Sequence, residues 1–211
     1  MKAETERFCL MGEGTSRYED RKSVFLGFSS PVKSEEEAKR FLEKIRHEYA
    51  DANHHVFAYY LLENQIMRYS DDGEPQGTAG LPVLNVLKTI PLQDAAVAVV
   101  RYFGGTLLGT GGLTRAYGAA AKEAVENGGV GVLKRYLSYD AELSYPDYTR
   151  LASMLSRPFV RLDDTSFAET VRLCFSVYAP ESEKFMEGVS ELTGGRVIPT
   201  ETGTVFIPVK K

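Results

Sequence analysis

The 211-residue chain contains no tryptophan and only two cysteines, Cys9 and Cys174. Two cysteines far apart in the sequence do not make a disulfide framework, so we interpret both as free thiols of a cytoplasmic protein. Long hydrophobic runs are also missing, because the apolar stretches fall well short of the roughly 18 residues that cross a bilayer. The opening residues mix acids and bases and lack the apolar core of a secretory signal. These absences predict a cytoplasmic protein without a membrane anchor.

Standard catalytic and cofactor-binding motifs are missing as well. The sequence has no G-x-S-x-G, H-E-x-x-H or C-x-x-C pattern. The glycines between 104 and 112 are not followed by the lysine of a phosphate-binding P-loop, and Thr114 stands where a dinucleotide fingerprint needs its third glycine. We therefore predict no cofactor, no metal and no catalytic residue, and an enzymatic activity has no support from motifs.

The charge balance limits the kind of partner. The formal net charge is -4, so the chain is not a globally basic nucleic-acid binder, and any binding of this kind needs a local basic patch. The composition, 43% hydrophobic and 26% charged, is that of a folded globular protein. Its length suits one large domain or two small ones.

Hydrophobic periodicity predicts an α+β protein of two domains, 1–136 and 137–211. In the first domain, Ser34 and Glu37 form a capping box that opens a helix. Residues 94–103 include a β-branched run that is apolar on both faces, which predicts a central strand. The expected elements of this domain are a strand at 23–29, a helix from 34, a hairpin of 54–62 with 65–69, a helix at 78–87, the strand at 94–103 and a helix that ends near 127.

The second domain reads as strand, helix, strand, strand, helix, strand, which is the order of the ferredoxin-like split βαβ unit. Alternation predicts its strands and apolar stripes predict its helices. We expect strands at 139–145, 159–162, 171–177 and 205–209, helices from 146 and from 180, a turn at 163–166 and a short linker at 134–138.

The stretch from Arg101 to Arg115 is the most unusual in the chain. It runs from the expected central strand through five glycines into a helix: Gly104, Gly105, Gly109, Gly111 and Gly112. Unpaired amides and a partial positive charge at a helix N-terminus accept anions, and glycines let an anion approach the backbone. Arg115 and Lys122 share the outward helix face, so we predict an anion- or nucleic-acid-binding surface that includes them together with Arg68 and Arg101. The alternative is a tight turn that needs glycine for positive φ and close packing.

The acidic turn Asp71, Asp72 and Glu74 is the second candidate site. Its first interpretation is structural: carboxylates that fix Arg68, Arg101 or Arg115 by bidentate bonds. A recognition surface ranks second, and a Mg²⁺ or Ca²⁺ site last, because three acids do not fill the shell of a cation. We expect the turn to lie near the glycines, with at least one carboxylate paired to Arg101 or Arg115.

Two segments carry a family resemblance. The segment from Arg68 to Gly80, RYSDDGEPQGTAG, and the segment from Arg101 to Tyr117 resemble the IMPACT family in its bacterial YigZ-like branch, and the similarity covers the whole chain. The resemblance implies a first domain related to the second domain of a ribosomal small-subunit protein and to GHMP kinases. It implies a second domain similar to the last domain of elongation factor G. Eukaryotic relatives regulate translation initiation through the activator of an initiation-factor kinase, a partner that does not carry over to a bacterial chain.

Two functions follow as hypotheses. The first is a non-enzymatic regulatory or binding protein linked to translation, with RNA, the ribosome or a translation factor as partner. The alternative is an enzyme, or a binder of a small phosphorylated ligand, at the glycine-rich loop.

Overall fold

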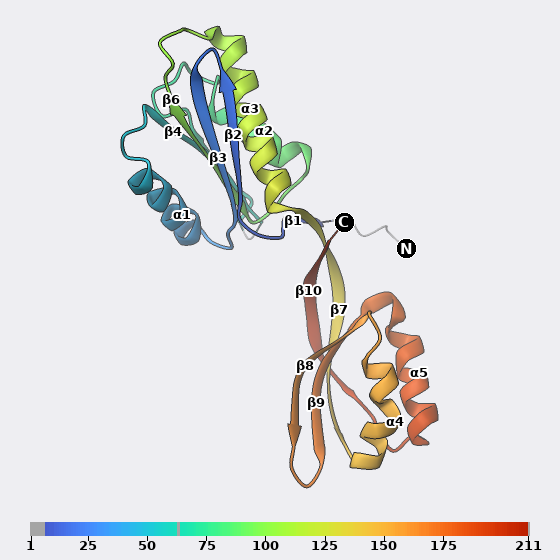
Figure 1. Cartoon of the computed structure of the whole chain (residues 1–211). Coiled ribbons are helices and arrows are strands. Elements are labelled where there is room, and N and C mark those ends of the chain that lie inside the picture. Colours follow the sequence, from blue (N-terminus) through green and yellow to red (C-terminus); the bar gives the residue numbers. More distant parts are fainter. Residues whose placement is uncertain (1–6, 63, 211) are drawn as a thin grey trace. The chain divides into compact units, whose positions relative to one another are not determined.

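The computed structural model describes residues 7–62 and 64–210, which form two compact units (Figure 1). Residues 1–6, which carry the prediction about a secretory signal, lie outside this description. The first unit holds the described residues through Leu133 together with those from Pro208 onward, and the second holds Lys134 to Ile207. The boundary therefore falls three residues before the one predicted, and the end of the last strand belongs to the first unit.

Residues 134–138 are not a linker but part of the long strand β7 (Val130–Leu143). The first residues of β7 pair with β1 (Arg7–Leu10), and the residues from Tyr136 onward pair with β9 (Val171–Tyr178). Continuous pairing holds the backbone extended where the local sequence shows no strong strand pattern, because ladder hydrogen bonds can override intrinsic propensity.

The first unit is built on a five-stranded sheet of order β2–β3–β6–β4–β5, in which every neighbouring pair is antiparallel. The strands are β2 (Gly14–Asp20), β3 (Ser23–Pro31), β6 (Ala95–Tyr102), β4 (His54–Leu61) and β5 (Ile66–Ser70). Strand β6 is central and its first seven residues are buried, as its apolar sequence predicts. Because β3 and β4 flank β6 and both run antiparallel to it, they are parallel to each other and joined through a helix.

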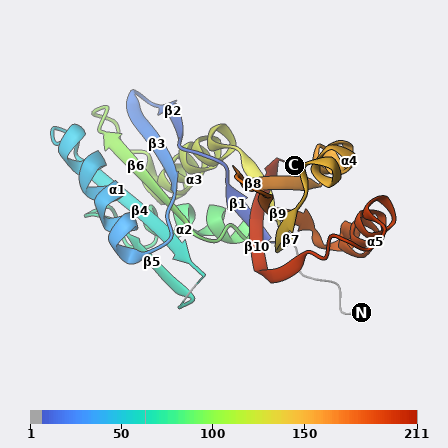
Figure 2. The same ribbon diagram turned by 90° about the horizontal axis from the view of Figure 1, so that it is seen from below.

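Helices cover both faces of this sheet. Helix α1 (Glu35–Glu48) packs on one face, whereas α2 (Gly80–Thr89) and α3 (Gly109–Gly128) pack on the other (Figures 1 and 2). Side chains alternate along β6, so Val97 and Val99 join the core under α2 and α3, and Ala98 and Val100 join the core under α1. Arg101 thus lies on the α2–α3 face.

The predicted cap of α1 is present with one change. The Ser34 hydroxyl accepts a hydrogen bond from the Glu37 amide at 3.2 Å. The Glu37 carboxylate, however, accepts from the amide of Lys33 at 2.7 Å, one residue before the cap. Helix α2 begins at Gly80 and ends at Thr89, two residues later at each end than predicted.

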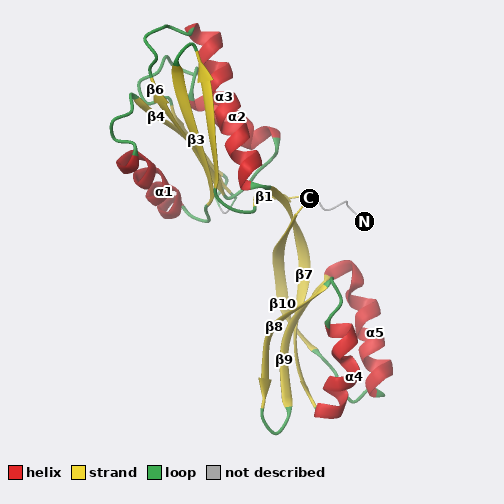
Figure 3. Ribbon diagram, in the orientation of Figure 1, coloured by secondary structure: helices red, strands yellow, loops and turns green. Residues whose placement is uncertain are grey.

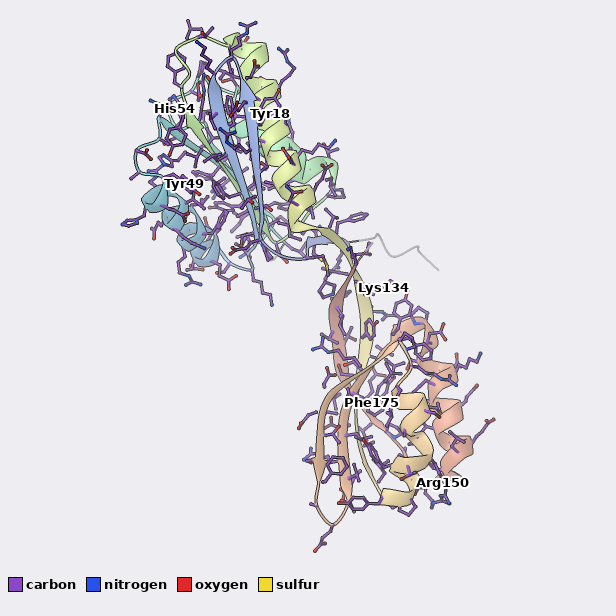
Figure 4. All side chains as sticks on the ribbon, viewed as in Figure 1. Tyr18, Tyr49, His54, Lys134, Arg150 and Phe175 are labelled. Atoms are coloured by element: carbon purple, nitrogen blue, oxygen red, sulfur yellow. The ribbon has the colours of Figure 1, made fainter. Side chains whose placement is uncertain are left out.

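The second unit contains β7, α4 (Tyr145–Leu155), β8 (Val160–Phe167), β9, the 3₁₀ turn η1 (Ala179–Glu181), α5 (Ser182–Thr193) and β10 (Thr200–Lys210). This is the predicted βαββαβ order. Its strands lie in the order β10–β7–β9–β8, and α4 and α5 cover one face of the sheet (Figure 3). Phe175 of β9, labelled in Figure 4, packs with Tyr139 and Phe185 in the core between sheet and helices.

Two local predictions in this unit are wrong. Residues 163–166 form the second half of β8 rather than a turn, because they pair with β9 past an irregularity between Leu162 and Asp164. Tyr145, predicted to end the strand at 139–145, is the first residue of α4 and is exposed. Long-range strand pairing sets the first boundary, whereas the Ser144 hydroxyl, which accepts from the Asp147 amide, caps the helix at the second.

Asp147 joins the start of α4 to the segment that leads into β10. The residue is buried, and its carboxylate accepts hydrogen bonds from Arg196 and Arg150, each at 2.8 Å, and from the Ser144 hydroxyl at 2.9 Å. These donors, Arg196 first, hold the pKa of Asp147 far below its usual range.

Among the described residues, no helix is long and apolar enough to span a membrane.

We predict that Asp147→Asn lowers the melting temperature at pH 7. Because the folded-state pKa lies below the ordinary value of 3.8, the carboxylate stabilises the fold above that pH and loses its contribution as pH falls further. The difference in melting temperature between wild type and variant should therefore shrink below about pH 4, which thermal unfolding followed by circular dichroism measures. A difference that stays constant from pH 7 to pH 2.5 would contradict this assignment.

Candidate functional site at the glycine-rich loop

A row of four paired residues crosses the sheet at one level. Tyr18 pairs with Phe25, Phe25 with Arg101, and Arg101 with His54 (Figure 4 labels Tyr18 and His54). Directly opposite residues point to the same face of a sheet, so all four side chains face α2 and α3. The row places the Arg101 guanidinium against the Phe25 ring, 5.4 Å from its centroid.

Glu74 and Arg101 form a buried ion pair. Arg101 Nη1 donates to Glu74 Oε1 at 2.6 Å, and the two side chains are 5% and 4% exposed. The Tyr117 hydroxyl donates to the same oxygen at 2.7 Å, and Arg101 Nη2 reaches the Ser23 hydroxyl at 3.4 Å. The expected pairing of a turn carboxylate with Arg101 is thus present. Burial first, and then the Glu74 carboxylate, raise the pKa of Tyr117 well above its usual range, which keeps the hydroxyl a donor.

Asp71 stabilises a helix instead of pairing with an arginine of the glycine segment. Its carboxylate accepts hydrogen bonds from the amides of Gly77 at 2.9 Å, Ala79 at 3.1 Å and Gly80 at 2.8 Å. These contacts close the turn and place a negative charge at the N-terminus of α2, where the helix dipole favours it. A side chain at Gly80 would lie 2.7 Å from the Ser70 carbonyl oxygen, so only glycine fits beside the turn.

Asp72 joins the turn to α1 and β4. Its carboxylate accepts from the His55 amide at 2.7 Å and pairs with Arg46 at 3.1 Å, and its backbone carbonyl accepts from His54 Nδ1 at 2.8 Å. His54 Nε2 then lies 3.8 Å from Glu74. His54 and His55 face opposite sides of the sheet, as adjacent strand residues must. No local pattern pairs Asp72 with Arg46, because 26 residues separate them.

The glycines of the loop have separate roles. Gly104 lies against the backbone of Lys22, where any side chain would overlap the Lys22 carbonyl carbon, and its amide donates to the Ser23 hydroxyl at 3.1 Å. Gly105 and Gly109 adopt φ of 80° and 73°, which favours glycine, and a side chain at either would meet open space. A side chain at Gly112 would lie 2.9 Å from the Leu108 Cβ. The structural interpretation of these glycines therefore holds for 104, 105, 109 and 112, whereas Gly111 lies beside Arg115, whose Nη1 would be 3.5 Å from a side chain there.

The loop presents apolar and basic groups to solvent. Phe103 is 45% exposed and has its ring 5.4 Å from the Arg101 guanidinium, while Leu107 is 81% exposed. Arg115 is exposed, and Arg21 on the β2–β3 turn donates to the Leu107 carbonyl at 3.4 Å. No carboxylate occurs between Phe103 and Lys122 in the sequence. The stretch from Phe103 to Lys122 therefore exposes apolar and basic side chains and carries no carboxylate of its own.

The structure separates the other predicted anion-binding residues from this loop. Arg68 pairs across strands with Tyr59, whose side chain belongs to the core under α1, so Arg68 lies on the opposite face of the sheet from Arg115. Lys122 lies roughly 10 Å further along α3 than Arg115 and pairs with Glu126 at 3.7 Å. Arg101 is buried and its charge is neutralised by Glu74. Of the four basic residues predicted, only Arg115 belongs to the exposed loop surface.

We predict that Arg101→Met destabilises the protein by about 3–5 kcal/mol, because it leaves the Glu74 charge buried without its cation. The double variant Glu74→Leu with Arg101→Met should cost less than this single substitution, since no uncompensated charge is left. Urea denaturation of the three proteins measures both effects. A single-variant cost below about 1 kcal/mol would mean that the pair does not hold the fold together.

Comparison with known proteins identifies the family. The model of the Impact N-terminal domain matches residues 21–125, and that of a domain of unknown function, DUF1949, matches residues 142–196. IMPACT family member YvyE of Bacillus subtilis (strain 168) is 40% identical over 179 residues, which cover 83% of this chain and 81% of that protein. IMPACT family member YigZ of Escherichia coli (strain K12) is 31% identical over 180 residues, 84% of this chain and 88% of that protein.

A solved structure agrees with these matches. The crystal structure of a hypothetical protein is 28% identical and superposes with a TM-score of 0.59, covering 93% of this chain and 97% of the other. Both signature segments, with the buried ion pair that links them, lie within the matched Impact N-terminal domain. The chain, which combines an Impact N-terminal domain with a DUF1949 domain, therefore belongs to the IMPACT family.

Proposed function

We propose that this protein is a non-enzymatic regulator linked to translation that binds RNA through the loop from Phe103 to Arg115. The observation that carries the proposal is the surface of this loop: Phe103, Leu107 and Arg115 are exposed, and Arg21 donates to the Leu107 carbonyl. No carboxylate occurs between Phe103 and Lys122 in the sequence. The family membership supports a role near translation as an expectation, whereas the RNA partner rests on the chemistry of the loop.

The loop offers both interactions that single-stranded RNA uses. Arg115 supplies a fork of donors that suits a phosphate. Helix α3 begins at Gly109 with no acidic residue in its first turn, so its amides and dipole favour the same negative charge. Phe103 presents an exposed aromatic ring on which a base can stack, a contact that every base can make. The predicted binding is therefore tolerant of sequence and sensitive to salt.

Buried contacts fix the shape of this surface before any ligand arrives. Gly104 is held against the β2–β3 turn by Ser23, and the same serine contacts Arg101. The Arg101 guanidinium lies over one face of Phe103, which orients the exposed ring. A preorganised loop loses less conformational entropy on binding, so a small surface can still bind RNA measurably.

The acidic side chains of the two signature segments, together with Arg101, are engaged within the fold and are not arranged as catalytic groups. Glu74 and Arg101 are buried in their mutual ion pair, and Tyr117 keeps its proton through its raised pKa. Asp71 and Asp72 bind backbone amides of their own unit. These engagements favour a scaffold for a binding loop over a set of groups that exchange protons with a substrate.

A binder of a small phosphorylated ligand is the second candidate. The observation in its favour is the open space around Gly105 and Gly109, next to the acid-free first turn of α3. Competition by ATP or inorganic phosphate at millimolar concentration distinguishes the two: a small-ligand site is blocked at constant ionic strength, and an RNA surface is not.

We predict that Arg115→Ala weakens binding of a fluorescein-labelled 20-nucleotide single-stranded RNA several-fold at 50 mM salt, measured by fluorescence anisotropy. The slope of log K against log salt should fall by about 1, as expected for the loss of one phosphate contact. The fold should stay intact, because the side chain is exposed. Lys184→Ala on α5 of the second unit removes one exposed charge and serves as the matched control with unchanged affinity.

Three results would refute the proposal. They are a wild-type protein that binds no RNA at 50 mM salt, an Arg115→Ala variant with wild-type affinity, and an Arg115→Ala variant that unfolds. Co-sedimentation with purified ribosomes adds a further check, since an association that survives complete ribonuclease digestion indicates a protein partner and also contradicts the RNA assignment.

A further inference from the structure

The turn between β2 and β3 is strained. Asp20 pairs with Ser23, so only Arg21 and Lys22 form the hairpin loop, and both have positive φ, 45° and 68°. Two-residue hairpin loops with positive φ at both positions strongly prefer Asn-Gly, because other side chains crowd the backbone there. An Arg-Lys pair in this loop is thus an unfavourable choice for stability.

Packing does not account for the choice. The side chains of Arg21 and Lys22 are exposed, and the Arg21 guanidinium donates a long hydrogen bond of 3.4 Å to the Leu107 carbonyl. The close contact of Lys22 with Gly104 involves its backbone, which an Asn-Gly turn would present equally well. Backbone strain without a packing reason is typical of functional positions.

The position of the turn points to its ligand. The Arg21 guanidinium contacts the glycine-rich loop at the Leu107 carbonyl, and the backbone of Lys22 lies against Gly104, so the turn adjoins the stretch from Phe103 to Arg115, which contains no carboxylate. Glu19 is paired with Arg17, and this pair lies on the α1 face with Leu26. Asp20 is the carboxylate of the turn and shares the α3 face, and the two loop residues beside it, Arg21 and Lys22, are both basic and exposed.

We propose that the Arg21–Lys22 turn is the second half of the RNA surface and binds the sugar–phosphate backbone, at the expense of hairpin stability. This inference rests on the proposed function of the loop. It assigns a separate role to each part: the strained turn and Arg115 contact phosphates, and Phe103 stacks on a base. The turn thereby determines affinity and salt dependence rather than sequence preference.

The test is the double variant Arg21→Asn with Lys22→Gly, which installs the preferred turn. We expect opposite effects on stability and binding. The melting temperature of the full chain should rise by roughly 2–4 °C or more, because the strain is relieved. Affinity for the labelled 20-nucleotide RNA at 50 mM salt should fall at least tenfold, and the salt slope should fall by about 2, one for each lost phosphate contact.

Two control variants separate charge from strain. Lys184→Gln with Lys210→Gln removes two exposed positive charges from α5 and β10, outside the loop and its turn, and should leave RNA affinity within twofold of wild type. Gln65→Gly relieves the positive φ of 51° in the turn before β5 without a change of charge, so it should raise the melting temperature and leave binding unchanged.

The outcomes distinguish this inference from the proposed function. Wild-type RNA affinity in the Asn-Gly variant, with a weakened Arg115→Ala variant, overturns the role of the turn and leaves the loop proposal standing. A lower melting temperature in the Asn-Gly variant overturns the claim of strain. Absence of RNA binding by the wild-type protein refutes both proposals together.

Discussion

The buried ion pair between Glu74 and Arg101 is the interaction on which the functional end of the first unit depends. Its two partners come from the acidic turn and from the end of the central strand, and Tyr117 of α3 donates to the same carboxylate oxygen. Withdrawing two charges from water is costly, and the pair is favourable only because donors surround the carboxylate. The same guanidinium lies between Phe25 and Phe103, so it also sets the position of the exposed ring. A single interaction therefore joins the turn, the sheet, α3 and the glycine-rich loop.

The three acids of the signature all point toward their own unit, and each joins a different pair of elements. Asp71 stabilises the start of α2, Asp72 joins α1 to β4, and Glu74 joins β6 to α3. Because these carboxylates bind amides and cations within the fold, they do not oppose the basic groups of the loop. This arrangement explains how a chain with a net charge of -4 exposes basic and apolar side chains along a loop that carries no carboxylate of its own.

The proposed binding surface is unfavourable for stability. Gly104, Gly105 and Gly109 allow the loop its close contacts and its positive φ, but glycine loses more conformational entropy on folding than other residues, and the Arg21–Lys22 turn adds backbone strain. The buried Glu74–Arg101 pair offsets part of this loss of stability, because it holds the loop in place from its buried side. A buried ion pair beneath a strained, exposed loop is the expected arrangement where a surface is selected for its chemistry rather than for its packing.

Local patterns in the sequence determined the elements. The two-faced apolar run of β6, the cap at Ser34 and the βαββαβ order of the second unit all depend on residues near one another, so periodicity and capping chemistry were sufficient. Only the tertiary structure decided which side chains meet. Arg68 and Arg115 are both basic residues of signature segments, yet strand register puts them on opposite faces, and β7 continues through residues 134–138 because β1 and β9 pair with it. The burial of Arg101, the capping of α2 by Asp71 and the strain of the Arg21–Lys22 turn likewise depend on contacts or backbone angles that no local pattern encodes. Register and long-range packing are properties of the whole sheet, which is why the sequence predicted the pairing of a turn carboxylate with Arg101 but not the roles of Arg68, Asp71 and Asp72.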